Sequence, residues 1–102
     1  MRFMFTISFP VEAGNAAAKK DGFHAIQNIL QEQKPEAAYF KTINGQRSCL
    51  MIINMDDASE IPVIAEPWFL ALNASIDVSP VMVPADLAKA GPAIQKAVKT
   101  HR

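Results

Sequence analysis

Apolar and polar side chains alternate at the start of the chain, over residues 2–10. Phe3, Phe5, Ile7 and Phe9 share one side, and Met4, Thr6 and Ser8 share the other. This period of two is typical of a strand with one buried face. A secretory signal is a poorer interpretation, because Thr6 and Ser8 interrupt the apolar run, Pro10 ends it, and Glu12 lies where a cleavage site would be. We therefore predict a first strand over residues 2–10.

A helical period follows this strand. Between residues 16 and 33 the apolar side chains fall on one side of a helical wheel: Ala16, Phe23, Ile26, Ile29 and Leu30. Gly14-Asn15 offers a turn and a cap at the start, and Pro35 ends the helix because proline disfavours helical geometry at the preceding residue. We predict one amphipathic helix over residues 16–33, with His24 facing solvent.

Asn44-Gly45 lies between two β-rich segments, 37–43 and 46–53. This dipeptide favours a two-residue type I′ turn, because both central residues of that turn need a positive φ. The turn fixes the pairing, so that Phe40 faces Cys49 and Lys41 faces Ser48. One face of the hairpin then carries Ala38, Phe40, Cys49, Met51 and Ile53, and the other carries Tyr39, Lys41, Ser48, Leu50 and Ile52.

A second helical stripe covers residues 61–72 and is made of Ile61, Ile64, Ala65, Trp68 and Leu72. It follows an acidic segment, Asp56 to Glu60, that suits a helix start. Pro67 removes the backbone bond to the carbonyl of Val63, so we predict a kink or two short helices there.

The last part of the chain predicts one more strand and a tail. Residues 75–83 form a strand in which Pro80 indicates a sheet edge or a bulge. Residues 84–102 are expected to be helical, with an interruption at Gly91-Pro92.

This order of elements is β-α-β-β-α-β, which is the ferredoxin-like arrangement. The predicted fold class is α+β, with four antiparallel strands, two helices on one face, and a C-terminal helix. The length suits one domain, residues 1–102, of which 83–102 form the helical tail. The sheet face away from the helices would carry Met4, Thr6, Ser8, Tyr39, Lys41, Ser48, Leu50 and Ile52. Such a face is too apolar for water, so we expect a homodimer in which a second copy covers it.

The net charge of the chain limits which classes of binding partner it suits. Ten basic residues balance ten acidic ones, which argues against a nucleic-acid or anionic-membrane binder. No segment approaches the ~18 apolar residues of a membrane span, and one Cys agrees with a cytoplasmic location.

Residues 56–86 hold six acids and no base, and residues 87–102 hold four bases and no acid. We expect the basic tail to lie near the acidic helix of the same chain or of a partner; two unrelated solvated surfaces are the alternative. The bases concerned are Lys89, Lys96, Lys99 and Arg102.

The element order over residues 2–83 resembles that of the dimeric α+β barrel superfamily. Trp68-Phe69, followed by a strand that reads Ile76-Asp77-Val78-Ser79-Pro80-Val81-Met82, is similar to a small bacterial family of domains of unknown function within it. The resemblance implies homodimers whose sheets close into a barrel, with a ligand cleft between helices and sheet. Its members include cofactor-independent and haem-degrading monooxygenases, isomerases and stress-response proteins, so the fold selects no chemistry.

Five residues are candidates for that cleft: Trp68, Tyr39, Lys41, Ser48 and Asp77. Trp68 is either a core anchor or the wall of a cleft for an aromatic or acyl ligand. Lys41, if a partner encloses it, needs an acid such as Asp77 or an anionic ligand; otherwise it extends to the rim. Arg47 flanks the turn and is expected to be exposed.

The remaining reactive residues indicate no reaction. Cys49 is expected to be a buried structural thiol, because neither a histidine nor a helix start is predicted beside it. No spacing suits a metal, and no motif suits a nucleotide cofactor, so no metal, cofactor or catalytic residue is assigned.

Two functions are compatible with these features. The first is a homodimer that binds a small hydrophobic or aromatic molecule without catalysis. The alternative is a cofactor-independent monooxygenase or isomerase, with Trp68, Tyr39 and His24 lining a pocket. An enclosed cavity on which Trp68, Tyr39 or Lys41 converge would favour the enzyme, and a filled helix–sheet interface would favour the binding protein.

Overall fold

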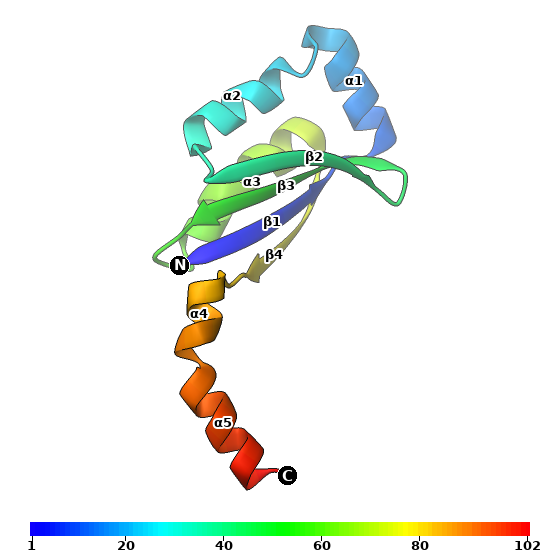
Figure 1. The fold of residues 1–102 in the computed structure, drawn as a ribbon. Helices are drawn as coiled ribbons and strands as arrows, with labels where there is room; N and C mark the ends of the chain where they lie inside the picture. Colours follow the sequence, from blue (N-terminus) through cyan, green and yellow to red (C-terminus); the bar gives the residue numbers. More distant parts are fainter.

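A computed structural model describes residues 1–102. The chain forms one antiparallel sheet, three helices that cover one of its faces, and a helical tail (Figure 1). The strands are β1 (Arg2–Ser8), β2 (Ala37–Ile43), β3 (Gln46–Asn54) and β4 (Ser75–Pro80), and the helices are α1 (Val11–Asp21), α2 (His24–Gln33), α3 (Glu60–Leu72), α4 (Pro84–Lys89) and α5 (Gly91–Thr100). The strand order is β2-β3-β1-β4 with antiparallel pairing throughout. This architecture confirms the predicted α+β, ferredoxin-like fold.

The hairpin pairs as its turn predicts. Phe40 faces Cys49, Lys41 faces Ser48, and Tyr39 faces Leu50. Asn44 and Gly45 have φ values of 51° and 77°, as a type I′ turn requires.

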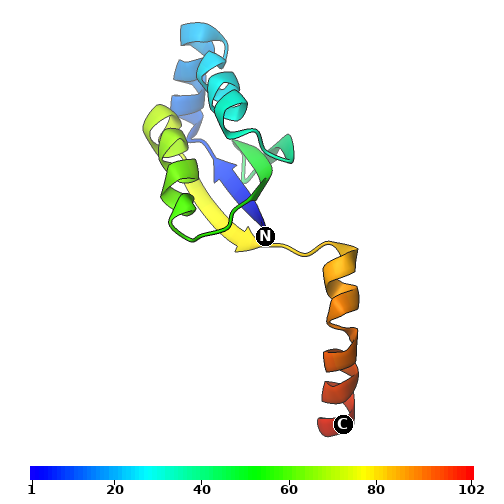
Figure 2. The same ribbon diagram turned by 90° about the vertical axis from the view of Figure 1, so that its left-hand side faces the viewer.

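The core lies between the sheet and α1–α3. Its largest fully buried side chains are apolar, apart from one thiol and one hydroxyl: Trp68, Phe5, Phe9, Ile7, Met51, Leu72, Cys49 and Ser48. The predicted stripe of α3 is confirmed, because Ala65, Trp68 and Leu72 are buried. No helix of the chain covers the other side of the sheet (Figure 2). We call this side the open face; it carries the outward side chains of β1–β4, among them Met4, Thr6, Tyr39, Leu50, Ile52 and Asp77.

The predicted helix over residues 16–33 is wrong in two respects. The helix begins at Val11, directly after Pro10, so Gly14 lies inside α1 rather than at its cap. The helix also breaks at Gly22, which has a φ of 62°. The N–H groups of Gly22 and Phe23 bond back to the carbonyls of Ala18 and Ala17, which closes α1. The carboxylate of Asp21 then accepts a bond from the backbone N–H of His24 and starts α2.

Pro67 does not divide α3, which runs as one helix from Glu60 to Leu72. The carbonyl that loses its partner belongs to Val63, whose side chain is 69% exposed, so that part of the helix lies in contact with water. Pro80 ends β4, three residues earlier than predicted, and β4 is an edge strand as expected.

The tail leaves the body of the molecule. The tail is helical, as predicted, and consists of α4 and α5, neither of which contains a buried residue. Its interruption falls at Ala90, one residue before the predicted Gly91-Pro92, which form the first turn of α5. It extends away from the sheet and its helices, beyond the end of β4 (Figures 1 and 2). The one salt bridge of the chain joins Arg2 to Glu36, so the basic residues of the tail pair with no acid of their own chain.

Candidate functional site

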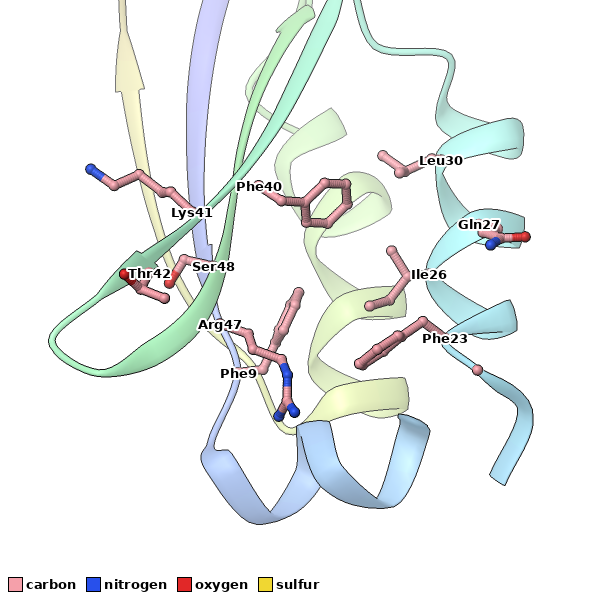
Figure 3. A pocket seen from close by; sticks show the side chains of 11 residues that line it. Phe9, Phe23, Ile26, Gln27, Leu30, Phe40, Lys41, Thr42, Arg47 and Ser48 are labelled. Atoms are coloured by element: carbon pink, nitrogen blue, oxygen red, sulfur yellow. The ribbon is translucent and has the colours of Figure 1, made fainter. Parts of the chain in front are cut away.

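A cleft of about 540 Å³ opens between α2 and the β2–β3 hairpin (Figure 3). It lies on the helix side of the sheet, where the resemblance places a ligand. Apolar side chains dominate its wall, and no acidic residue takes part. The lining residues are Phe9, Gly22, Phe23, Ile26, Gln27, Leu30, Phe40, Lys41, Thr42, Arg47 and Ser48.

The cleft exists because α2 stands away from the edge strand β2. Phe40 points toward α2, as the hairpin pattern predicts, yet it is 58% exposed (Figure 3). Its neighbour in the pairing, Cys49, lies one strand further in and is fully buried. The helices therefore bury Phe5 and Ile7 of β1 and Cys49 and Met51 of β3, and leave the inner side of β2 accessible at Phe40.

The break between α1 and α2 places Phe23 in the cleft. Phe23 has a φ of 67°, a left-handed conformation that costs a residue with a Cβ about 1–3 kcal/mol. The ring points into the cleft opposite the hairpin (Figure 3). Backbone strain of this kind persists where the surrounding structure over-determines it, and it is enriched at ligand sites.

Arg47 is the cation whose side chain lies in the cleft. Its Nη1 donates a hydrogen bond of 3.0 Å to Oδ1 of Asn15. Its guanidinium carbon lies 5.5 Å from the centroid of the Phe23 ring, within range of a cation–π contact. A Cβ at Gly14 would lie 2.7 Å from Nη1, so the glycine leaves the room that this guanidinium occupies.

Trp68 lies behind the cleft rather than on its surface. It is fully buried and stacks on Phe9, with ring centroids 6.0 Å apart and planes inclined by 8°. Its Nε1–H donates to the side-chain oxygen of Gln33 at 3.1 Å, and the amide nitrogen of Gln33 donates to the carbonyl of Ile64 at 2.8 Å. Trp68 is therefore placed as a core anchor, which is the first of the two roles considered for it in the sequence analysis.

The other four predicted site residues do not gather in one place. Tyr39 and Asp77 lie on the open face, at opposite edges of one cross-strand row that runs Tyr39, Leu50, Thr6, Asp77. Lys41 and Ser48 border the cleft, but the amine of Lys41 points away from it (Figure 3). The hydroxyl of Ser48 is buried and shares a 2.9 Å hydrogen bond with that of Ser8.

Lys41 and Asp77 cannot pair within one chain. They lie on the first and the fourth strand of the sheet, and three strand spacings amount to about 14 Å. An acid for Lys41 would have to come from elsewhere. His24 is exposed, as expected.

Cys49 is buried, as predicted. Desolvation raises the pKa of its thiol from 9.0 to about 11, so the group is a neutral, poorly nucleophilic thiol near pH 7. No group of three or more His, Cys, Asp and Glu side chains is arranged to hold a metal ion. No helix has the length and apolar character needed to cross a membrane.

Two signals for this site were present in the sequence. Gly22 after Lys19-Lys20 is a helix-end pattern, and it predicts the break that turns Phe23 inward. β1 ends at Ser8 rather than at residue 10 as predicted, so Phe9 follows the strand. The alternation with Phe5 and Ile7 correctly put Phe9 on the helix side, but nothing local shows that it borders a cavity. The cleft itself depends on the spacing between α2 and β2, which only the folded chain defines.

The sequence matches, over residues 1–95, a family described as "Domain of unknown function (DUF3303)". The chain belongs to the DUF3303 family. This confirms the coarser part of the resemblance, namely a family of domains of unknown function with an α+β fold. Membership of the dimeric α+β barrel superfamily stays a prediction for this DUF3303 chain.

None of the curated proteins compared with the DUF3303 chain matches it. Among solved structures, it is similar to a formyltetrahydrofolate deformylase from Pseudomonas putida KT2440, with 13% identity and a TM-score of 0.48. The match covers 79% of the DUF3303 chain and 29% of the deformylase chain. At this degree of similarity no property of the deformylase is transferred.

Proposed function

We propose that this DUF3303 chain forms a homodimer that binds a small apolar molecule in the cleft between α2 and the β2–β3 hairpin. The observation that carries the ligand-binding part is the cleft itself. Its volume of about 540 Å³ lies within the range of small-molecule sites, and its wall combines aromatic and aliphatic side chains with a few polar groups. Phe9, Phe23 and Phe40 line it from the β1–α1 connection, the α1–α2 connection and β2, respectively (Figure 3).

The cleft exposes apolar surface that a ligand could cover. Phe40 is more than half exposed in a concave setting, although its pattern is that of a core residue. Burial of apolar area is favourable by about 25 cal/mol per Å². An apolar molecule that covers the rings of Phe40 and Phe23 would therefore gain free energy that the chain alone leaves unused.

A filled helix–sheet interface was expected of the binding protein, and the cleft means that this interface is not filled. We nevertheless favour binding without catalysis, because the residues of the enzyme alternative do not converge on the cleft. The enzyme alternative rested on Trp68, Tyr39 or Lys41 converging on a cavity. In the structure Trp68 is in the core, Tyr39 is on the open face, and the amine of Lys41 points away from the cleft. The cytoplasm is the proposed location, because a free buried thiol suits a reducing compartment.

The homodimer is supported by the open face. Leu50 and Thr6 occupy the two central strands there, with Ile52 and Met4 paired in the next row. No helix of the chain shields these side chains (Figure 2). A second copy laid against this face would remove the apolar side chains from water and would bring a partner acid within reach of Lys41.

The tail supports the same assembly. Leu87, Ile94 and Val98 are each about half exposed, and α5 is shorter than the ~12–15 residues at which isolated helices become stable in water. A partner must therefore supply its packing. We assign that role to the second copy, because the tail is basic and the start of α3 is acidic.

The docking position on the second copy is the hollow beside the start of α3. This hollow measures about 230 Å³, and it combines apolar residues with two carboxylates at its edge: Met1, Phe3, Met55, Ala58, Ile61, Asp56 and Asp57. Apolar side chains of the tail would enter it while lysines face the carboxylates. Charge pairs of this kind select the partner more than they add affinity.

Ligand binding is tested by calorimetric titration with 1-naphthaleneacetamide and decanamide, which are apolar and uncharged. Both are expected to bind, and Phe40→Ser is expected to weaken binding at least about fivefold, because it removes most of a buried ring. Phe69→Ser is the matched control, since it makes the same substitution at a 38% exposed position on α3 that does not line the cleft. Equal loss in both variants, or no binding by the unaltered protein, would overturn the proposal.

Assembly is tested by light scattering coupled to size exclusion. The unaltered chain is expected at twice its mass, and Leu50→Asp is expected to yield monomer or unfolded protein, because a buried unpaired charge is costly. Leu70→Asp, at an 80% exposed position on α3, is the control and should remain dimeric. A monomer at micromolar concentration, or a Leu50→Asp variant with unchanged mass and melting temperature, would refute the dimer.

The tail contact is tested by reversing two of its charges. Lys96→Glu with Lys99→Glu should raise the dimer dissociation constant, and the effect should shrink with added salt. Lys19→Glu with Lys20→Glu on α1 provides a control of equal charge change. An equal effect of both pairs would show that net charge, and not tail docking, controls association.

A further inference from the structure

We infer that Arg47 binds the carboxylate of the ligand, so that the molecule taken up by the cleft is an apolar organic acid. This inference rests on the proposed function, which concerns an apolar ligand of any charge. Arg47 is the one lining residue whose cationic group lies against the apolar wall (Figure 3). No acidic residue lines the cleft, so an anion that enters it meets no like charge.

The guanidinium has donors to spare. Its one side-chain hydrogen bond goes to Asn15, which is neutral, and no carboxylate of the chain pairs with it. A guanidinium carries several N–H donors in a planar fork that matches the two oxygens of a carboxylate. The structure therefore presents a cation with an unused binding edge at an apolar cavity.

The guanidinium is also held in place before any ligand arrives. Asn15 fixes it from α1, and the ring of Phe23 lies beneath it at 5.5 Å. Gly14 leaves the space in which it sits. Groups positioned in advance lose less entropy on binding, which is how a single charge contributes specificity.

The strained Phe23 has a role in this arrangement. Its left-handed backbone turns the ring toward both the cleft and Arg47. One side chain thus contributes an apolar wall and a support for the cation. The pair matches a ligand whose hydrophobic body and acidic head are close together.

The number of cations favours a monoanion. One guanidinium balances one carboxylate, whereas a phosphate monoester carries more charge and would draw on a second cation. Lys41 borders the cleft, but its amine points to the other side of the hairpin. We therefore assign a carboxylic acid rather than a phosphate ester.

The test compares acids with their uncharged isosteres on the full chain. Calorimetric titrations use 1-naphthaleneacetate against 1-naphthaleneacetamide and decanoate against decanamide, with 1-naphthyl phosphate as a third head group. Each acid is expected to bind about tenfold or more tightly than its amide, because charge-assisted hydrogen bonds replace neutral ones. Arg47→Gln should abolish this preference and leave amide affinity within about twofold, since the apolar wall is unchanged.

Lys19→Gln is the matched control, because it removes one charge from an exposed position on α1 that does not line the cleft. It should alter neither affinity. Equal binding of acid and amide by the unaltered protein would overturn the inference while leaving the proposed function intact. Arg47→Gln lowering both affinities alike would overturn it too, because Arg47 would then serve only to shape the cleft. Stronger binding of the phosphate would reassign the head group, and no binding of any probe would refute the proposed function together with this inference.

Discussion

Trp68 stacks on Phe9 with nearly parallel rings, 6.0 Å between centroids, and this contact joins the core to the cleft. Both rings are buried, but Phe9, which is 1% exposed, is one of the residues that line the cleft, and Trp68 on α3 is not. A ligand that touches Phe9 is therefore one ring away from the only indole of the chain.

The first prediction is that ligand binding changes the fluorescence of Trp68. Decanoate and decanamide do not absorb where tryptophan does, so a change in emission is not an inner-filter effect or energy transfer to the ligand. We expect a saturable shift whose midpoint agrees with calorimetry. Phe9→Leu should reduce the amplitude of the shift, because an aliphatic side chain transmits less of the perturbation to the indole. Calorimetric binding without any change in emission would show that a bound ligand does not perturb Trp68 through Phe9.

The second prediction concerns Gln33, whose amide bonds both the indole N–H of Trp68 and the carbonyl of Ile64. Gln33→Leu leaves the buried N–H without an acceptor. We expect the free energy of unfolding to fall by about 1–3 kcal/mol, measured by urea denaturation. Gln31→Leu, at an exposed position on the same helix, should change it by less than about 0.5 kcal/mol. Equal effects of the two substitutions would show that the amide bonds contribute nothing.

The part of the fold that follows from local rules was predictable from sequence. Asn44-Gly45 alone determined the register of β2 and β3, because a two-residue turn permits one pairing. The prediction of a single helix over residues 16–33 misses the break at Gly22, because the apolar spacing outweighs the helix-end signal of that glycine. A helical pattern of apolar residues can continue across a break between two helices, so the pattern alone does not reveal the break.

The candidate site was less predictable, because it depends on distances between elements. Strand alternation correctly put Phe40 on the helix side, and burial would normally follow. The separation of α2 from β2 leaves it exposed instead. Trp68 was considered for the site because it is large and faces inward, and those same properties place it in the core.

The third prediction follows from the raised pKa of Cys49, about 11 in the folded chain against an ordinary 9.0. A raised acid pKa means that folding favours the neutral thiol. The stabilisation is complete below pH 9 and is lost as the pH rises toward 11. The unfolding free energy of the unaltered protein, relative to Cys49→Ala, should fall by roughly 2–3 kcal/mol across that window. A constant difference between pH 8 and pH 11 would show that the thiol is hydrated in the fold.

The fourth prediction concerns the exposed pair of Arg2 and Glu36. Hydrogen bonds from Nε of Arg2, at 2.8 and 3.1 Å, lower the pKa of the Glu36 carboxyl. A lowered acid pKa stabilises the fold above the unfolded pKa, and this contribution is lost as the pH falls through the folded pKa. NMR titration should show the pKa of Glu36 rising in Arg2→Met. An unchanged titration of Glu36 would mean that the pair does not persist in solution.

The fifth prediction separates the position of Arg47 from its charge. A methyl group at Gly14 would lie 2.7 Å from Nη1 of Arg47, so Gly14→Ala forces the flexible guanidinium to move. Alanine favours the interior of α1 by about 1 kcal/mol over glycine, so the melting temperature should hold or rise. Affinity for 1-naphthaleneacetate should nevertheless fall several-fold, because the cation no longer lies over Phe23, while affinity for the amide is retained. Gly91→Ala, where nothing lies within 4 Å of the added carbon, should change neither affinity. A Gly14→Ala variant that binds the acid normally would show that the guanidinium finds the ligand without being held in place.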